Sequence, residues 1–217
     1  MLTVKTPVIG TKEWFYLLAT CFVLGVPSAS VAELDRVFPQ LATVTGVSAG
    51  DTLNIRSESR GSSADIGDLQ PSSTVEVLEV EQTGKWARIL HEEGSGWIAA
   101  RFLNATPYKT THAGVPLGLM CIGTEPFWSL SLNTNQTLTF EQPSFGRRTL
   151  NSTWSTRSVN SGGAVYGIAN QDVQAILRRA SCSDGMSDRI YGWEVDVLTN
   201  GAEQPTLLSG CCFAQVN

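Results

Sequence analysis

Four cysteines are the residues with the clearest chemistry in this sequence. Cys211 and Cys212 are adjacent near the C-terminus, and Cys121 and Cys182 lie upstream. Neighbouring residues of a strand point to opposite faces of a sheet, so we expect the adjacent cysteines to bond separately to Cys121 and Cys182. Four cysteines allow three pairings, and the sequence leaves the choice open. We take Cys121 with Cys211 and Cys182 with Cys212 as the working assignment.

The two predicted disulfides close loops of about 90 and about 30 residues, which corresponds to roughly 4–5 and 3–4 kcal/mol of stabilisation in a chain-entropy model. A strained Cys211–Cys212 disulfide would be a reducible alternative. The sequence has no Cys-x-x-Cys motif and no histidine near these cysteines. In an oxidising compartment four thiolates would oxidise rather than hold zinc. We therefore expect structural disulfides and neither a metal nor another cofactor.

Three carboxylates are the other candidates for chemistry. Glu125, Asp184 and Asp188 could converge as the acid and base of a hydrolase, and Asp184 and Asp188 could share a cation. Calcium requires six to eight oxygen ligands, so a tight turn at Asp184-Gly185 is the simpler interpretation. No nucleophile elbow, phosphate loop or His-Glu-x-x-His motif is present. We expect no enzymatic activity.

The first 32 residues have the pattern of a signal peptide. Two lysines precede an apolar run from Trp14 to Val26, and the small residues of Ser30–Ala32 follow it. The run is about 13 residues long, whereas a helix needs about 20 to cross a bilayer. We predict cleavage before Glu33. The alternatives are a retained membrane anchor or lipidation at Cys21, and either would attach the protein to a membrane.

The remaining chain is acidic and long enough for two small domains. Without residues 1–32 it has 13 Lys and Arg against 19 Asp and Glu, a net charge of −6. No basic field directs it to nucleic acid. We expect a periplasmic or secreted protein that contacts a membrane only if the first segment is retained or lipidated.

The first predicted domain covers residues 42–104 and consists of short strands. Val75–Val80 and Trp86–Ile89 alternate in hydrophobicity, and turn residues follow at short intervals. This pattern predicts a small β-barrel.

Four phrases in this domain resemble the bacterial SH3-like domain. They are Leu53–Ser57, Ile66–Leu69, Gly84–Ile89 and Gly96–Leu103. The resemblance implies a small barrel of secreted and envelope proteins, many of which are thought to bind cell-wall peptidoglycan or peptides. Trp86 and Trp97 are the candidate ligand-binding residues, because an exposed indole can stack on a sugar or pack against a peptide. The alternative is that both fill the small core.

A linker is predicted at residues 105–116, and a second β domain at residues 117–217. Segments 129–132 and 137–140 suit a hairpin, and alternation from Tyr191 onward predicts another near the C-terminus. Residues 172–180 fit a helix or a strand, and we expect a strand. The predicted fold is therefore mainly β: a small SH3-like barrel followed by a disulfide-stabilised antiparallel β barrel or sandwich.

Phrases in the second domain resemble two groups of envelope proteins. Cys121–Trp128, Ser181–Arg189 and Gly210–Cys212 together resemble a family of uncharacterised bacterial envelope proteins, which implies no established activity. Ser161–Tyr166 loosely resembles the Ser/Gly-rich loop of bacterial lysozyme inhibitors, although Val165 stands where a basic residue is expected.

These patterns predict an exported, non-catalytic envelope protein. Its SH3-like module would bind or target it to peptidoglycan or to an envelope peptide or protein. The alternatives are an inhibitor or sensor of a cell-wall hydrolase, and the carboxylate hydrolase described above.

Overall fold

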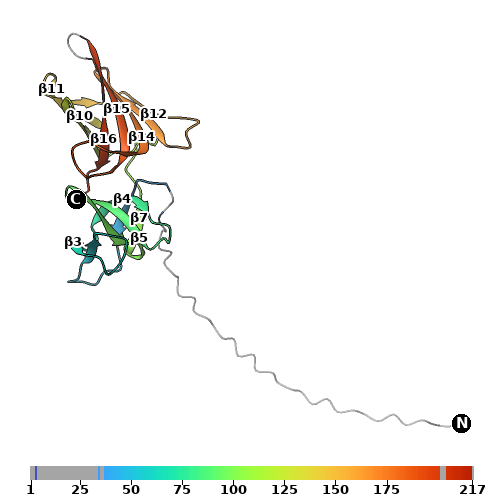
Figure 1. Cartoon of the computed structure of the whole chain (residues 1–217). Coiled ribbons are helices and arrows are strands. Elements are labelled where there is room, and N and C mark those ends of the chain that lie inside the picture. Colours follow the sequence, from blue (N-terminus) through green and yellow to red (C-terminus); the bar gives the residue numbers. More distant parts are fainter. Residues whose placement is uncertain (1–2, 4–33, 35–36, 201–203, 217) are drawn as a thin grey trace. The chain divides into compact units, whose positions relative to one another are not determined.

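The computed structural model describes residues 3, 34, 37–200 and 204–216 (Figure 1). The predicted signal peptide at 1–32, including Cys21, lies outside the described residues except for Thr3. No helix in the described part of the chain is long and apolar enough to cross a membrane. The described residues from 34 onward belong to one compact unit and form two antiparallel sheets.

The first sheet has seven strands in the order β3-β2-β6-β5-β4-β1-β7. Apolar side chains alternate along its strands, and those on one face are buried together in a core around Ile55, Val77, Ile89 and Ile98. This confirms the strands expected from alternation. The elements are β1 (Gln40–Val44), β2 (Leu53–Arg56), β3 (Asp65–Leu69), β4 (Thr74–Val80), β5 (Trp86–His91), β6 (Gly94–Ala99), the 3-10 turn η1 (Ala100–Phe102) and β7 (Leu103–Thr106).

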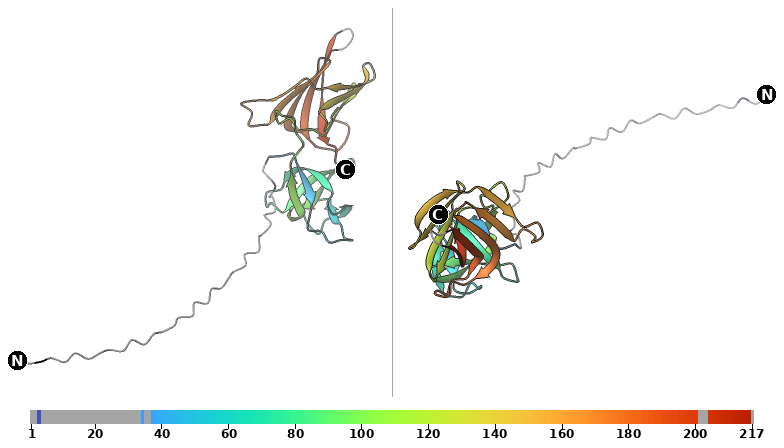
Figure 2. Two further views of the ribbon diagram at one scale, coloured as in Figure 1. Left: turned by 180° about the vertical axis from the view of Figure 1, so that it is seen from behind. Right: turned by 90° about the horizontal axis from the view of Figure 1, so that it is seen from above.

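The second sheet has nine strands in the order β11-β10-β9-β8-β16-β15-β14-β13-β12. It curls as a half-barrel around a separate core that includes Phe140, Leu177 and Trp193 (Figures 1 and 2). Its strands are β8 (Leu119–Thr124), β9 (Phe127–Leu132), β10 (Thr137–Gln142), β11 (Gly146–Asn151), β12 (Trp154–Arg157), β13 (Val165–Ala169), β14 (Val173–Cys182), β15 (Tyr191–Asn200) and β16 (Pro205–Ala214).

The predicted fold class is confirmed: the protein is mainly β, with two sheets and two disulfides in the C-terminal region. The ambiguous segment 172–180 is a strand, because alternate residues such as Ala175 and Leu177 enter the core while β13 and β15 pair with its two edges. The two predicted hairpins are present as β9–β10 and β15–β16.

The segment 105–116, predicted to be a linker, contacts both sheets. Its first two residues complete β7, and Thr110 forms a bridge with Pro116. Val115 is fully buried in the core of the nine-stranded sheet. The hydroxyl of Tyr108 donates a 2.7 Å hydrogen bond to a carboxylate on β4. Sequence patterns missed this packing because the contacts are made by single residues without periodicity.

The carboxylate on β4 belongs to Glu76, and it joins the two sheets. Glu76 is only 4% exposed and accepts hydrogen bonds from the hydroxyl of Tyr108, from the indole N–H of Trp193 at 3.0 Å and from the backbone N–H of Ala214 at 3.0 Å. Burial raises the pKa of Glu76 above its usual 4.5, although these donors and the charge of Arg179 act to lower it. One acidic residue of the first sheet thus satisfies three donors from outside that sheet.

Arg179 of β14 and Arg189 of the β14–β15 loop make further contacts with the first part of the chain. The Arg179 guanidinium lies 4.6 Å from the centre of the Trp193 ring of its own sheet, and its Nη1 donates to the carbonyl oxygen of Pro39, which directly precedes β1. Nη2 of Arg189 lies 3.3 Å from the carboxylate of Glu93 in the β5–β6 turn. These polar contacts add to the Glu76 hydrogen bonds in holding the sheets together.

Candidate functional site

The outer face of the seven-stranded sheet presents a row of five residues on five neighbouring strands. In the strand register, Arg56 of β2 pairs with Asp65 of β3 and with Trp97 of β6, Trp97 pairs with Arg88 of β5, and Arg88 pairs with Glu79 of β4. Directly paired residues point to the same face with Cβ atoms about 4.5–5.5 Å apart. We call these five residues the Trp97 row.

The Trp97 row places an indole between two arginines, each of which lies beside a carboxylate. Arg88 lies 3.0 Å from Glu79 and Arg56 lies 3.7 Å from Asp65, measured between nitrogen and oxygen. The arginine side chains are 23–24% exposed, and the two carboxylates are 49% and 40% exposed. Trp97 is half-buried. The arrangement offers a flat apolar surface flanked by hydrogen-bond donors of positive charge.

Arg88 retains an unused donor in this row. Its Nη1 donates to Oε1 of Glu79, whereas its Nε is buried and has no hydrogen-bond partner in the described structure. A buried donor without a partner costs about 1–3 kcal/mol. An acceptor supplied by a ligand would remove that cost.

Trp86, the other candidate ligand-binding tryptophan, contacts the core of the protein. It is half-buried and packs against the core of the seven-stranded sheet. By register it pairs with Ala99, two residues beyond Trp97, so the two indoles are diagonal neighbours on one face. The sheet thus brings both predicted ligand-binding residues together, with Trp97 in the centre of the row.

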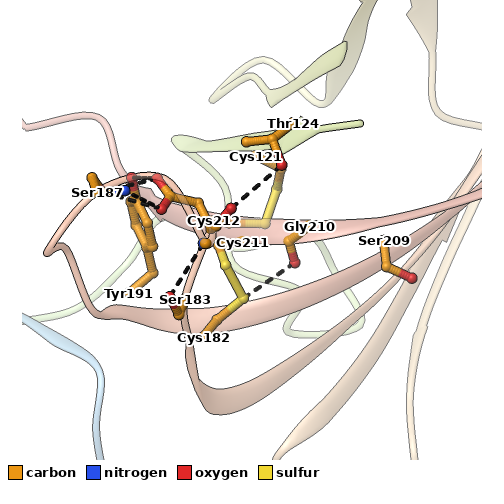
Figure 3. The surroundings of a disulfide bond; sticks show 12 residues. Cys121, Thr124, Cys182, Ser183, Ser187, Tyr191, Ser209, Gly210, Cys211 and Cys212 are labelled. Carbon is orange, nitrogen blue, oxygen red and sulfur yellow. Dashed lines mark hydrogen bonds between the residues drawn. A yellow bond between two sulfur atoms is a disulfide. The ribbon is translucent and has the colours of Figure 1, made fainter. Parts of the chain in front are cut away.

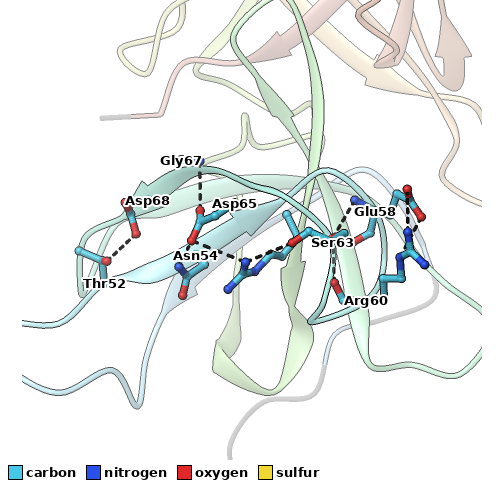
Figure 4. A network of polar contacts seen from close by, with 9 residues as sticks. Thr52, Asn54, Glu58, Arg60, Ser63, Asp65, Gly67 and Asp68 are labelled. Carbon is cyan, nitrogen blue, oxygen red and sulfur yellow. Dashed lines mark hydrogen bonds and ion pairs between the residues drawn. The ribbon is translucent and has the colours of Figure 1, made fainter.

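A polar network orders the β2–β3 side of the row (Figure 4). The amide of Asn54 donates to Asp65, and the hydroxyl of Thr52 donates to Asp68 at 2.6 Å. Within the turn between β2 and β3, the buried hydroxyl of Ser63 donates to the carbonyl of Arg60 at 2.8 Å. Bonds of this kind hold the edge of the row in place before any ligand arrives.

The disulfides join Cys121 to Cys212 and Cys182 to Cys211 (Figure 3). All four predicted cysteines are therefore bonded, and the adjacent pair bonds separately as expected. The working assignment of Cys121 to Cys211 and Cys182 to Cys212 is wrong. Cys212 directly opposes Cys121 in the register of β8 and β16 and points into the core, so Cys211 points to the opposite face, where Cys182 lies.

The C-terminal motif phrases meet at these disulfides through close packing. The indole of Trp128 lies against Gly123 and Gly210, and a Cβ atom on Gly123 would stand 2.1 Å from its Nε1. A Cβ atom on Gly210 would stand 2.1 Å from the carbonyl oxygen of Ile122. The spacing of glycine, cysteine and tryptophan in these phrases is explained by a tightly packed junction of β8, β9 and β16.

Two open cavities border this junction. One has a volume of about 550 Å³ and is lined by Phe127, Trp128 and the Glu141–Arg147 pair, among others. The other has a volume of about 400 Å³ and includes the Cys182–Cys211 disulfide and the polar side chains of β14 and β15. The half-barrel therefore has room for a ligand of its own.

Of the three predicted carboxylate residues, Asp184 organises the turn that the sequence suggested. Asp184 accepts hydrogen bonds from the N–H groups of Ser187 and Met186 at 2.9 and 3.0 Å and from the hydroxyl of Tyr191 at 3.1 Å. Burial acts to raise the pKa of Asp184, but these donors outweigh it and lower the pKa to about 2. The carboxylate that makes the turn is thus an ionised one.

The other two carboxylates, Glu125 and Asp188, are exposed. Glu125 is in the β8–β9 turn, and the neighbouring Thr124 hydroxyl donates to the backbone carbonyl of Asp184 at 3.3 Å. No three His, Cys, Asp or Glu side chains in the described ranges are grouped so as to hold a metal ion. Of the segment Ser161–Tyr166, the first four residues form the turn before β13, with Gly162 and Gly163 at positive φ, and the last two begin β13.

Residues 51–104 match the family model of the bacterial SH3 domain. The matched stretch contains β2 to β6 and every residue of the Trp97 row. The comparisons with curated proteins and with solved structures found no match. The family match identifies the N-terminal module. The kinship of the C-terminal phrases with envelope proteins stays a prediction.

Sequence reasoning missed Arg56, Arg88 and Glu76. Alternation in Leu53–Arg56 and Trp86–Ile89 could have placed both arginines on the outer face. Their position on either side of Trp97 depends on the pairing of β2 with β6, which are distant in the sequence. No local sequence pattern indicates that β2 pairs with β6.

Proposed function

We propose that the protein is an exported, non-catalytic component of the bacterial envelope whose SH3-like sheet binds peptidoglycan. The observation that carries the proposal is the Trp97 row, which lies entirely within the stretch that matches the bacterial SH3 domain. The two disulfides support export, because disulfides persist in oxidising compartments.

The chemistry of the row suits peptidoglycan, a polymer of sugar rings and short peptides with free carboxylates. The apolar body of an indole stacks on the flat face of a sugar or a peptide. Guanidinium groups bind carboxylates through paired, charge-assisted hydrogen bonds. Arg56 and Arg88 provide such groups on either side of Trp97, and both are held in position by neighbouring carboxylates.

Co-sedimentation with purified peptidoglycan tests the proposal. The oxidised chain of residues 33–217 is compared with Trp97→Ala and with Trp154→Ala. Trp154 is 46% exposed on β12 of the other sheet and serves as the matched control. We expect Trp97→Ala to weaken binding about tenfold, since a central aromatic anchor contributes more than about 1 kcal/mol. Trp154→Ala should pellet like the unmodified chain.

Two outcomes contradict the proposal. Equal pelleting of all three proteins would remove the row from binding, provided that the variants unfold at similar urea concentrations. Failure of the unmodified chain to pellet would remove peptidoglycan as the ligand. Release of soluble fragments from the polymer, abolished by Asp184→Asn, would instead reveal a hydrolase.

A further inference from the structure

A small cavity continues the Trp97 row to the place where the two sheets meet. It has a volume of about 150 Å³. Glu79 and Arg88, the last two members of the row, line it from the seven-stranded sheet, and Arg179, Ala180 and Ser181 line it from β14. A ligand lying on the outer face near Trp97 can therefore extend one end into this cavity.

Arg88, which lines the cavity, has the one buried side-chain donor without a hydrogen-bond partner in the described residues, its Nε. Glu79 engages Nη1 of the same guanidinium at 3.0 Å. Nε–H and one Nη–H of an arginine point along a common edge of the planar group, and such an edge binds a carboxylate through two parallel hydrogen bonds. This edge of Arg88 therefore suits a carboxylate.

The charges that line the cavity favour an anion. Two guanidiniums, Arg88 and Arg179, face one carboxylate, Glu79. Arg179 is already engaged with the Trp193 ring and the Pro39 carbonyl, and it also acts on the buried Glu76. Arg88 is therefore the residue that would bind the anion, and Arg179 contributes positive charge from the other side.

The size of the cavity limits what can enter it. Pockets that enclose a whole drug-sized ligand have volumes of about 300–1,000 Å³, and this cavity is smaller. It can take a terminal group and not a sugar ring. Ala180 and Ser181 on its far wall leave space for a small side chain next to the carboxylate.

We propose that this cavity binds the terminal carboxylate of a short peptide whose remaining residues lie along the Trp97 row. The inference rests on the proposed function and narrows it: the SH3-like face recognises peptide ends in peptidoglycan, with Arg88 as the carboxylate-binding residue. The second sheet then contributes part of the ligand site through Ala180 and Ser181.

Peptide titration of the oxidised chain of residues 33–217 tests the inference. The probes are acetyl-Ala-Ala-Ala with a free carboxylate and the same peptide as its C-terminal amide. We expect the free acid to bind about tenfold to a hundredfold more tightly than the amide, because the amide loses a charge-assisted pair of hydrogen bonds.

Two variants and one control locate the binding. Arg88→Lys retains the charge but loses the planar donor edge, and Ala180→Leu fills the cavity from the other sheet without changing any charge. Both should weaken binding of the free acid about tenfold. Arg60→Lys, at another ion-paired arginine, in the β2–β3 turn, should bind like the unmodified chain. Ala180→Leu decides the matter if Arg88→Lys does not fold.

The inference is overturned if the acid and the amide bind equally, if neither binds, or if Ala180→Leu binds the acid unchanged. These outcomes are independent of the sedimentation experiment. If Trp97→Ala prevents pelleting while the two peptides behave alike, the proposed function stands and the carboxylate site is wrong. If the unmodified chain does not pellet but prefers the free acid, the cavity binds a carboxylate and the peptidoglycan assignment is wrong.

Discussion

Replacing Glu76 should test how the two sheets are joined. Glu76→Leu keeps a side chain of similar size but leaves the hydroxyl of Tyr108 and the N–H groups of Trp193 and Ala214 without their acceptor. Three such unsatisfied donors cost about 3–9 kcal/mol. Removing a buried carboxylate recovers part of this, because a carboxylate loses hydration when it is buried. We expect a net loss of about 2–3 kcal/mol in the free energy of unfolding.

Glu76→Gln is the matched control for this substitution. Its amide oxygen can still accept from Trp193 and Tyr108, and its amide nitrogen faces the Ala214 N–H and cannot accept from it. The expected loss is about 1–3 kcal/mol at acidic pH, where the carboxyl is protonated. Stability should then decrease from the unmodified chain to Glu76→Gln and further to Glu76→Leu.

The pH dependence gives this prediction a second, independent measurement. Because burial raises the pKa of Glu76 in the folded protein, the unfolded chain releases its proton first as the pH rises. The folded state binds more protons in the window from the usual pKa of 4.5 up to the raised value, so the stability of the unmodified chain falls across it. The side chain of Glu76→Gln does not titrate. The difference in unfolding free energy between the unmodified chain and Glu76→Gln should therefore shrink as the pH rises through this window.

Urea unfolding of the oxidised chain, followed by tryptophan fluorescence from pH 4 upward, measures both effects. The linear dependence of the unfolding free energy on urea gives the difference between variants. Glu76→Leu as stable as the unmodified chain would refute the reasoning, since the buried donors would then not depend on this carboxylate. A deficit of Glu76→Gln that grows with pH would show that the sign of the pKa shift is wrong.

Two further predictions concern the C-terminal junction. Replacing Cys182 and Cys211 with alanine should leave no free thiol in the oxidised mature chain. Replacing Cys182 and Cys212 should leave two free thiols, because the remaining cysteines then point to opposite faces. Thiol titration under denaturing conditions measures both counts, and the reverse counts would support the pairing of Cys121 with Cys211. Gly210→Ala should destabilise the protein by about 1–3 kcal/mol, because the new Cβ atom would clash with the backbone. Gly61→Ala, with open space around it, should have little effect. Similar melting temperatures for the two variants would contradict the close packing of β8 against Gly210.

Alternation and turn residues predicted most of the strands, because side chains of a half-buried strand face core and solvent in turn. They assigned β14 correctly although Val173, Ile176 and Leu177 also fit a helix. The same rule gives the wrong face for Glu76, because alternation with the buried Val75 and Val77 would point this side chain to solvent. It is buried because the second sheet covers that part of β4, and this covering depends on residues more than a hundred positions away.

Some features of the candidate site likewise follow from local sequence, whereas others depend on distant residues. Local motifs and the alternation of side chains along a strand are enough to predict an SH3-like module, the presence of Trp86 and Trp97 in it, and separate partners for the adjacent cysteines. The choice of cysteine partners, the position of Arg56 and Arg88 on either side of Trp97, and the cavity that Arg88 lines depend on the folded chain. Strand register and the packing of one sheet on another bring together residues from distant parts of the chain. Local sequence patterns do not indicate which of these distant residues will be in contact.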